Sequence, residues 1–226
     1  MTTAVTHPRL PARRSATRAR SWWGKAWVRA VEESSYGEGD LRSGRALARG
    51  GRVGPITVEE GRFFAAVEDD EPGAVSVALP VLDPSAVDLL VELVGAESGR
   101  VGALLAGDLP HRLVEEAEEA GVELLPYGGE LGASCTCRAW LDPCPHALAV
   151  GLQVTWLLES DPLVLVHLRG LPREQLLGRL HERSGAPVEA ADDVETGLEA
   201  MLRAARILEL VDDDAPDGSV EIDHLF

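Results

Sequence analysis

The stretch SCTCRAWLDPCPHALAV, residues 134–150, is the most informative part of this chain. It holds all three cysteines of the 226 residues and one of the six histidines, in the order Cys-x-Cys, six residues, Cys-x-His. Three thiolates and one imidazole complete a tetrahedral shell around Zn²⁺ and leave no coordination position for a substrate. We therefore predict one structural zinc ion with four ligands: Cys135, Cys137, Cys144 and His146.

The spacing of these residues also predicts the local backbone. Residues i and i+2 point to the same face of a strand, so the first two cysteines can share a metal from an extended segment. On a helix, in contrast, residues i and i+2 point to different faces, so Cys144 and His146 cannot share a metal if both lie within one regular helix. Pro145 disfavours helical backbone at Cys144 and suits the first helical position itself. We expect Cys144 to be the N-cap of a helix that carries His146 in its first turn, where the helix N-terminus favours a thiolate.

The cysteines have other interpretations. They could be small buried apolar residues, or form a disulfide, although the cysteine count is odd and no secretory signal precedes them. A redox switch, in which oxidation of Cys135 or Cys137 ejects zinc, is a further alternative. The chain has no phosphate-binding Gly-rich loop with Lys, no Gly-x-Ser-x-Gly and no dinucleotide fingerprint. We therefore expect a protein that is not an enzyme.

Charge is unevenly distributed along the sequence. The net charge is −17, but residues 1–52 contain eleven basic and four acidic residues, a net of +7, and residues 53–226 have a net of −24. An acidic body repels nucleic acid, so any DNA contact should come from the N-terminal quarter. The candidate phosphate contacts are Arg13, Arg14, Arg18, Arg20, Arg42, Arg45, Arg49 and Arg52. The alternatives are a disordered leader or a transit peptide for residues 1–20, and a solvated loop for residues 36–51.

Hydrophobic patterning predicts an α+β fold with a small antiparallel sheet, several helices and the zinc knuckle joined to a helix. A helix should begin at the N-cap Ser21, with an apolar stripe of Trp23, Trp27, Ala30 and Val31 packed in the core. Trp22 lies off this stripe and is a candidate for base stacking. Three strands with turn signals between them are expected at 53–59, 62–68 and 74–79. Further helices are expected at about 83–94, 99–106, 110–120, 145–158, 161–170, 172–183 and 193–210.

We divide the chain into three parts on this basis. Residues 1–20 are expected to form a basic, disordered leader, residues 21–183 a zinc-containing domain, and residues 184–226 an acidic linker, an amphipathic helix and a disordered tail. No run of 18 apolar residues exists, so no membrane span is expected. A thiol-rich metal site without a secretory signal is typical of a reducing cytoplasm.

The cysteine–histidine pattern resembles the SWIM zinc finger. Similarity to the compact bacterial SWIM proteins extends over about residues 21–183, through the stretches SWWGKAWVRAVE, SGRALARGGRVGPITV, LLAGDLP, GVELLP and DPLVLVHLRGLPREQLL. The resemblance implies a non-catalytic zinc protein of the bacterial cytoplasm that mediates DNA binding, interaction with a SWI/SNF-type helicase-like ATPase, or both. The alternative is a pure protein-interaction module with no direct nucleic-acid contact.

Overall fold

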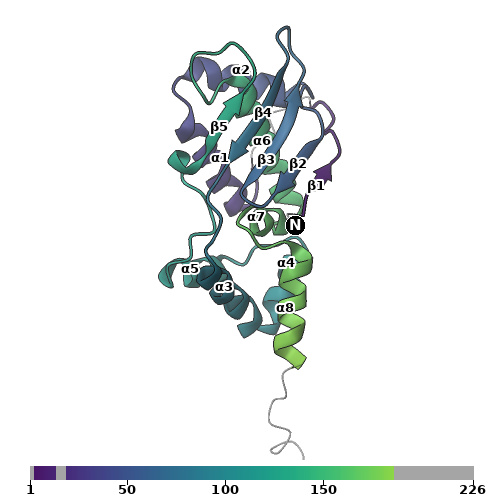
Figure 1. Cartoon of the computed structure of the whole chain (residues 1–226), viewed down its shortest axis with the longest axis vertical. Coiled ribbons are helices and arrows are strands. Elements are labelled where there is room, and N and C mark those ends of the chain that lie inside the picture. Colours follow the sequence, from purple (N-terminus) through teal and green to yellow (C-terminus); the bar gives the residue numbers. More distant parts are fainter. Residues whose placement is uncertain (1–2, 14–18, 186–226) are drawn as a thin grey trace, which may run out of the picture. The chain divides into compact units, whose positions relative to one another are not determined.

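A five-stranded antiparallel sheet forms one layer of the fold. The computed structural model describes residues 3–13 and 19–185. The strands follow the chain in spatial order: β1 (Val5–His7), β2 (Ile56–Glu59), β3 (Arg62–Val67), β4 (Gly73–Ala78) and β5 (Gly132–Cys135) (Figure 1). The α+β class is confirmed.

The three central strands are the meander expected from the sequence. Alternate residues of β2, β3 and β4 are buried, so one face of the sheet packs on the core. The turn between β2 and β3 is tight, and Gly61 adopts a φ of +74° there, a conformation that glycine reaches at no steric cost.

Both edge strands were missed by the sequence reasoning. The expectation of a disordered leader is wrong for the N-terminal residues that are described, because β1 pairs with β2 from Val5 to His7. Arg9 forms an ion pair with Glu68, and the carbonyl of Thr3 bonds the imidazole of His167 at 2.8 Å. A short edge strand is stabilised by hydrogen bonds to a distant strand, which local composition does not reveal. Arg14 and Arg18 lie outside the described residues.

Two helices precede the meander. α1 (Trp22–Ser34) begins at Ser21, whose hydroxyl accepts from the amide of Gly24, and the predicted apolar stripe is buried. The solvated loop considered for residues 36–51 is wrong, because Glu38–Arg49 form α2. Gly44 lies so close to α6 that an added Cβ would sit 2.8 Å from the Cβ of Leu148. Tertiary packing therefore stabilises a helix that has weak helical propensity.

The remaining helices follow the expected order along the chain. Asp83 caps the first of them, and its side chain accepts from the amide of Ala86. They are α3 (Pro84–Ala96), α4 (Ser98–Leu105), α5 (His111–Glu119), the 3₁₀ turn η1 (Gly128–Glu130), α6 (Pro145–Ser160), α7 (Leu163–Leu168) and α8 (Arg173–Gly185). None of the described helices is long and apolar enough to cross a membrane.

Contacts divide the chain into two compact units, Met1–Leu180 and His181–Phe226. The helix expected at 193–210 and the acidic tail lie outside the described residues. The domain boundaries proposed from the sequence stay predictions, and the sites described below belong to the first unit.

α6 is the central element of the first unit. It is buried on nearly all sides and packs against the sheet, α1 and α2. Indole N–H groups of α1 donate to its backbone, from Trp27 to the carbonyl of Gly151 at 3.0 Å and from Trp23 to that of Leu158 at 3.1 Å. The amide of Gln153 donates to the carbonyl of Ala48 in α2 at 2.8 Å. These bonds hold both N-terminal helices against α6.

Candidate metal centre and basic groove

The end of β5 carries the first half of the metal centre. Cys135 is paired with Val75 of β4, which directs its thiol to the buried face of the sheet. The amide of Thr136 donates to the carbonyl of Ala74 at 3.1 Å, and the Thr136 hydroxyl accepts from the amide of Ala74 at 2.9 Å. The extended backbone therefore continues past β5, and Cys137 follows on the same side as Cys135.

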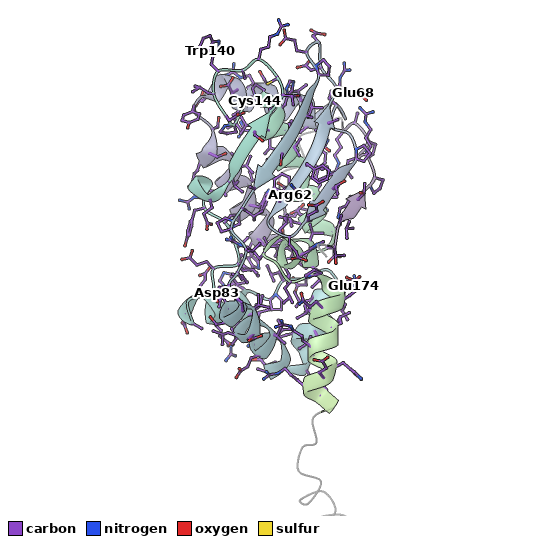
Figure 2. All side chains as sticks on the ribbon, viewed as in Figure 1. Arg62, Glu68, Asp83, Trp140, Cys144 and Glu174 are labelled. Carbon is purple, nitrogen blue, oxygen red and sulfur yellow. The ribbon has the colours of Figure 1, made fainter. Side chains whose placement is uncertain are left out.

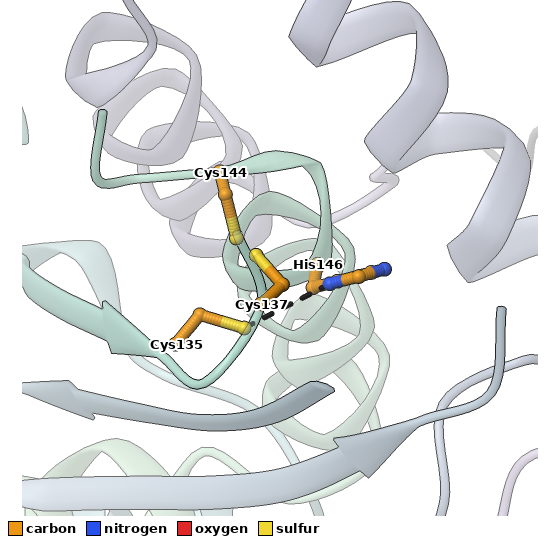
Figure 3. A group of neighbouring side chains, drawn as sticks. All are labelled: Cys135, Cys137, Cys144 and His146. Carbon is orange, nitrogen blue, oxygen red and sulfur yellow. Dashed lines mark hydrogen bonds between the residues drawn. The ribbon is translucent and has the colours of Figure 1, made fainter. Parts of the chain in front are cut away.

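The start of α6 carries the second half. Cys144 is the N-cap, with extended backbone (φ −77°, ψ 171°), Pro145 follows at the first helical position, and His146 lies in the first turn. This local geometry is the one expected from the spacing. It turns the Cys144 thiol and the His146 imidazole toward the two cysteines of the strand end (Figure 3).

The four side chains converge on one point. One ligand atom from each of Cys135, Cys137, Cys144 and His146 lies within 4.8 Å of all the others. Cys135 Sγ and His146 Nδ1 are 3.7 Å apart (dashed line in Figure 3). Tetrahedral zinc with Zn–S bonds of about 2.3 Å needs sulfurs roughly 3.8 Å apart, so this donor set fits one zinc ion. The Cys₃His cluster is consistent with a single structural zinc.

The imidazole of His146 is oriented by a carboxylate. Its Nδ1 faces the sulfurs, and its Nε2 lies 3.4 Å from Oδ2 of Asp69, in the turn between β3 and β4. Ligating histidines commonly donate their second N–H to a carboxylate, which fixes the tautomer and the ring plane. Asp69 is therefore a positioning residue for the metal ligand.

Gly73 completes the cradle around the site. A Cβ added at this position would lie 2.7 Å from Cys135 Sγ and 2.8 Å from His146 Nδ1. Such distances are shorter than van der Waals contact, so the first residue of β4 must lack a side chain for the ligands to converge. The sequence shows this glycine only as part of a turn.

Burial affects the ionisation of the thiols. Desolvation raises the pKa of Cys135 to about 12 and also raises the pKa of Cys144. Thiolates bind zinc, so the bound ion must displace protons from both groups. A divalent cation in this pocket therefore supplies the charge that the buried thiolates need.

The loop between the two pairs of ligands presents a large apolar side chain to solvent. Trp140 is fully exposed and Leu141 is 56% exposed. Figure 2 shows Trp140 projecting from the ribbon at the same end of the first unit as Cys144. The adjacent Asp142–Pro143 peptide bond is cis.

The arginines predicted to contact nucleic acid do not form one patch. Arg45 and Arg49 line a groove formed by α1, α2 and α6, and the guanidinium of Arg13 covers the ring of Trp156 at its end, 4.0 Å from the ring centroid. Arg20 lines a neighbouring hollow together with Arg13. Arg42 and Arg52 are exposed outside the groove lining.

This basic groove has a volume of about 590 Å³. Its cations come from two helices, with Lys25 and Arg29 on α1 facing Arg45 and Arg49 on α2. Glu32 is the one acidic residue in the lining and pairs with Arg45. The rest of the lining is Ala19, Val28, Ala48, Leu152, Thr155 and Trp156. The groove is thus positively charged at its rim and largely apolar below.

Sequence reasoning missed three groove residues. Lys25 and Arg29 are one helical turn apart in α1, and this spacing placed them on a shared polar face. Trp156 lies on α6 and is only half-buried. Trp22, the candidate for base stacking, instead donates to the carbonyl of Leu109 at 3.1 Å and packs edge-on against His111.

Comparison with known proteins agrees with the metal centre. A family model of the SWIM zinc finger matches residues 118–152. The chain is a distant homologue of the uncharacterized protein Rv2102 of Mycobacterium tuberculosis, with 26% identity over 181 residues that cover 78% of this chain. The chain spans 65% of the length of that relative. No solved structure matches it.

Proposed function

On the premise that this chain carries a SWIM zinc finger, we propose that it is a non-enzymatic accessory protein that binds nucleic acid. The observation that carries the proposal is the basic groove, where four cations gather in a chain whose net charge is −17. Two of them are ion-paired, Arg29 with Glu33 and Arg45 with Glu32. We place the protein in a reducing bacterial cytoplasm, where its thiols stay available for zinc.

The donor set supports a structural role for zinc. Four protein ligands complete a tetrahedral shell, so no position is left for a substrate or an activated water. Bound zinc would cross-link the end of β5 to the start of α6. The metal would thus stabilise the helix that forms the floor of the groove.

Electrostatics limits where nucleic acid can bind. The body of the chain is acidic and repels phosphates, and at 0.1 M salt this repulsion is screened beyond a Debye length of about 10 Å. Inside the groove, Lys25 and Arg49 have no ion-pair partner among the described residues, which leaves both cations free for phosphate. Binding should therefore be local to the groove and strongly dependent on salt.

Fluorescence anisotropy with labelled oligonucleotides over a range of salt concentrations tests this proposal. The double variant Lys25→Gln/Arg49→Gln should weaken binding and flatten the slope of log affinity against log salt by about 1.4–1.8. A charge-matched control, Arg112→Gln/Arg138→Gln, removes two exposed, ion-paired cations outside the groove and should leave the slope unchanged. If the parent protein binds no nucleic acid at 50 mM salt, the proposal is wrong.

A second candidate function is protein interaction through the finger loop, and Trp140 favours it. A fully exposed tryptophan on a loop with both ends at the metal centre is typical of a binding hot spot. Asp69, Asp70 and Glu71 lie beside this loop, so its surroundings disfavour nucleic acid. A helicase-like ATPase is the partner that the family resemblance suggests.

Co-purification with and without nuclease separates the two candidates. If the loop binds a protein directly, Trp140→Ala should remove a helicase-like ATPase from the nuclease-treated sample, and the Lys25→Gln/Arg49→Gln variant should retain it. If nuclease alone releases the ATPase, the association runs through nucleic acid and the second candidate is rejected.

A further inference from the structure

We infer that the basic groove takes a single nucleic-acid strand, with a base stacked on Trp156 and its phosphates held by the cations of α1 and α2. This inference rests on the proposed function and narrows the ligand from nucleic acid in general to single strands. It also assigns a nucleic-acid contact, the stacked base, to α6, a helix that contributes no cation to the groove.

The floor of the groove suits a base. Val28, Ala48, Leu152 and the indole of Trp156 give it an apolar lining beneath the charged rim. Proteins that bind single strands combine a positive groove, which follows the backbone, with aromatic side chains on which bases stack. A surface that contacted only phosphates would need no aromatic side chain at the bottom of the groove.

The ring of Trp156 already holds a planar cation. The guanidinium carbon of Arg13 lies 4.0 Å from the centroid of this ring, a cation–π contact, and the two residues also line the neighbouring hollow. A base that enters the groove can take this position, and the displaced Arg13 is then free to pair with a neighbouring phosphate.

A buried hydroxyl in the lining also lacks a partner. Thr155 is 2% exposed, and its Oγ1 makes no hydrogen bond to any described residue. Unsatisfied buried polar groups are rare and costly in folded proteins. This oxygen has less than 1 Å² of accessible surface, so a base in the groove would bond it only after neighbouring side chains move.

The arrangement of cations fits one strand better than two. Lys25 and Arg29 on one wall, and Arg45 and Arg49 on the other, each lie one helical turn apart. A strand between the walls meets cations on both sides and still turns a base toward α6. In a duplex the faces of the bases are stacked inside the helix, so they cannot reach an aromatic ring at the bottom of a groove.

The test compares three fluorescein-labelled probes with the zinc-loaded full chain at 50 mM salt: dT15, rU15 and a 15-bp duplex. We expect dT15 or rU15 to bind at least tenfold more tightly than the duplex, and comparison of dT15 with rU15 distinguishes DNA from RNA.

Trp156→Leu should weaken single-strand binding by about 5- to 150-fold, the range for loss of one stacked base. Its salt slope should not change, because stacking releases no counterions. Trp156→Phe should restore part of the affinity.

Cross-linking of the unmodified protein covers the case in which Trp156→Leu fails to fold. A dT15 strand with one 5-iodouracil base should cross-link at Trp156, and a cross-link at Trp140 instead would overturn the inference. Equal affinity for duplex and single strands, with no effect of Trp156→Leu, would also overturn it while leaving the proposed function intact. Failure of every probe to bind would reject both.

Discussion

Access of zinc to its ligands depends on Gly73. A methyl group there would lie within 3 Å of both Cys135 Sγ and His146 Nδ1. We predict that Gly73→Ala weakens zinc binding by about 1–3 kcal/mol, the usual cost of overpacking. Competition with a chromophoric chelator measures the change. Gly132→Ala is the matched control, because its added Cβ would come no closer than 3.8 Å to the carbonyl oxygen of Ala78. Equal affinities for the two variants would contradict the prediction.

Zinc affinity should depend on pH through the buried thiols. Burial raises the pKa of Cys135 to about 12 and raises that of Cys144, so both are protonated at neutral pH before the metal binds. Binding then releases at least two protons. Protons compete with the metal, so affinity should fall as pH falls, by about a hundredfold per pH unit. Chelator competition at pH 7 and pH 8 checks this, and an affinity independent of pH would show that the thiols were already ionised.

Between elements, Glu159 joins α6 to the start of α1. Its Oε1 accepts from the amides of Arg20 and Ser21 and from the Ser21 hydroxyl, which itself caps α1. Charged hydrogen bonds of this kind contribute about 1.5–3 kcal/mol each when lost. We predict that Glu159→Ala lowers the free energy of unfolding by about that amount, measured by urea denaturation. Glu119→Ala, at an exposed position of α5, should change it by less than about 0.5 kcal/mol.

The same contact has a consequence for the groove. α1 forms one wall, and Glu159 fixes the end of α1 that precedes Lys25. The wall on the other side is fixed by the close approach of Gly44 to Leu148 and by the bond from Gln153 to Ala48. Both walls are thus attached to α6, the helix that begins at the metal centre.

For the whole molecule, zinc should stabilise the fold without being its only support. Cys144 is 1% exposed and caps the central helix, so its loss should affect more than the finger. We predict that Cys144→Ala removes zinc and destabilises the protein by at least about 3 kcal/mol, or roughly 6–12 °C in Tm. A large hydrophobic core remains, so unfolding should be partial.

Thermal melting followed by circular dichroism, with and without a chelator, tests this. Chelation should lower the Tm of the parent protein toward that of Cys144→Ala and leave the variant unchanged. If the variant loses zinc but melts at the parental temperature, the knuckle is peripheral to the stability of the fold.

The sequence alone determined the metal ligands, the three-stranded meander and most helix starts, because these features depend on residues close together in the chain. The four candidate ligands lie within twelve residues, and Pro145 sets the backbone that turns Cys144 and His146 to one point. The meander and most helix starts follow from alternation, turns and caps within a few residues. Such features need no knowledge of distant parts of the chain, which is why they could be predicted.

Long-range packing decided the rest. β1 and β5 exist because each pairs with a strand far away in the sequence, and α2 is helical because Gly44 lets it pack on α6. The groove joins residues from α1, α2 and α6. The metal centre needs Gly73 of β4 beside ligands from the end of β5 and the start of α6. The free energy of these contacts comes from surfaces that meet only after folding. Sequence periodicity predicts which face of a helix is buried. It does not predict which other helix packs against that face, or that the cations of α1 and α2 line one groove.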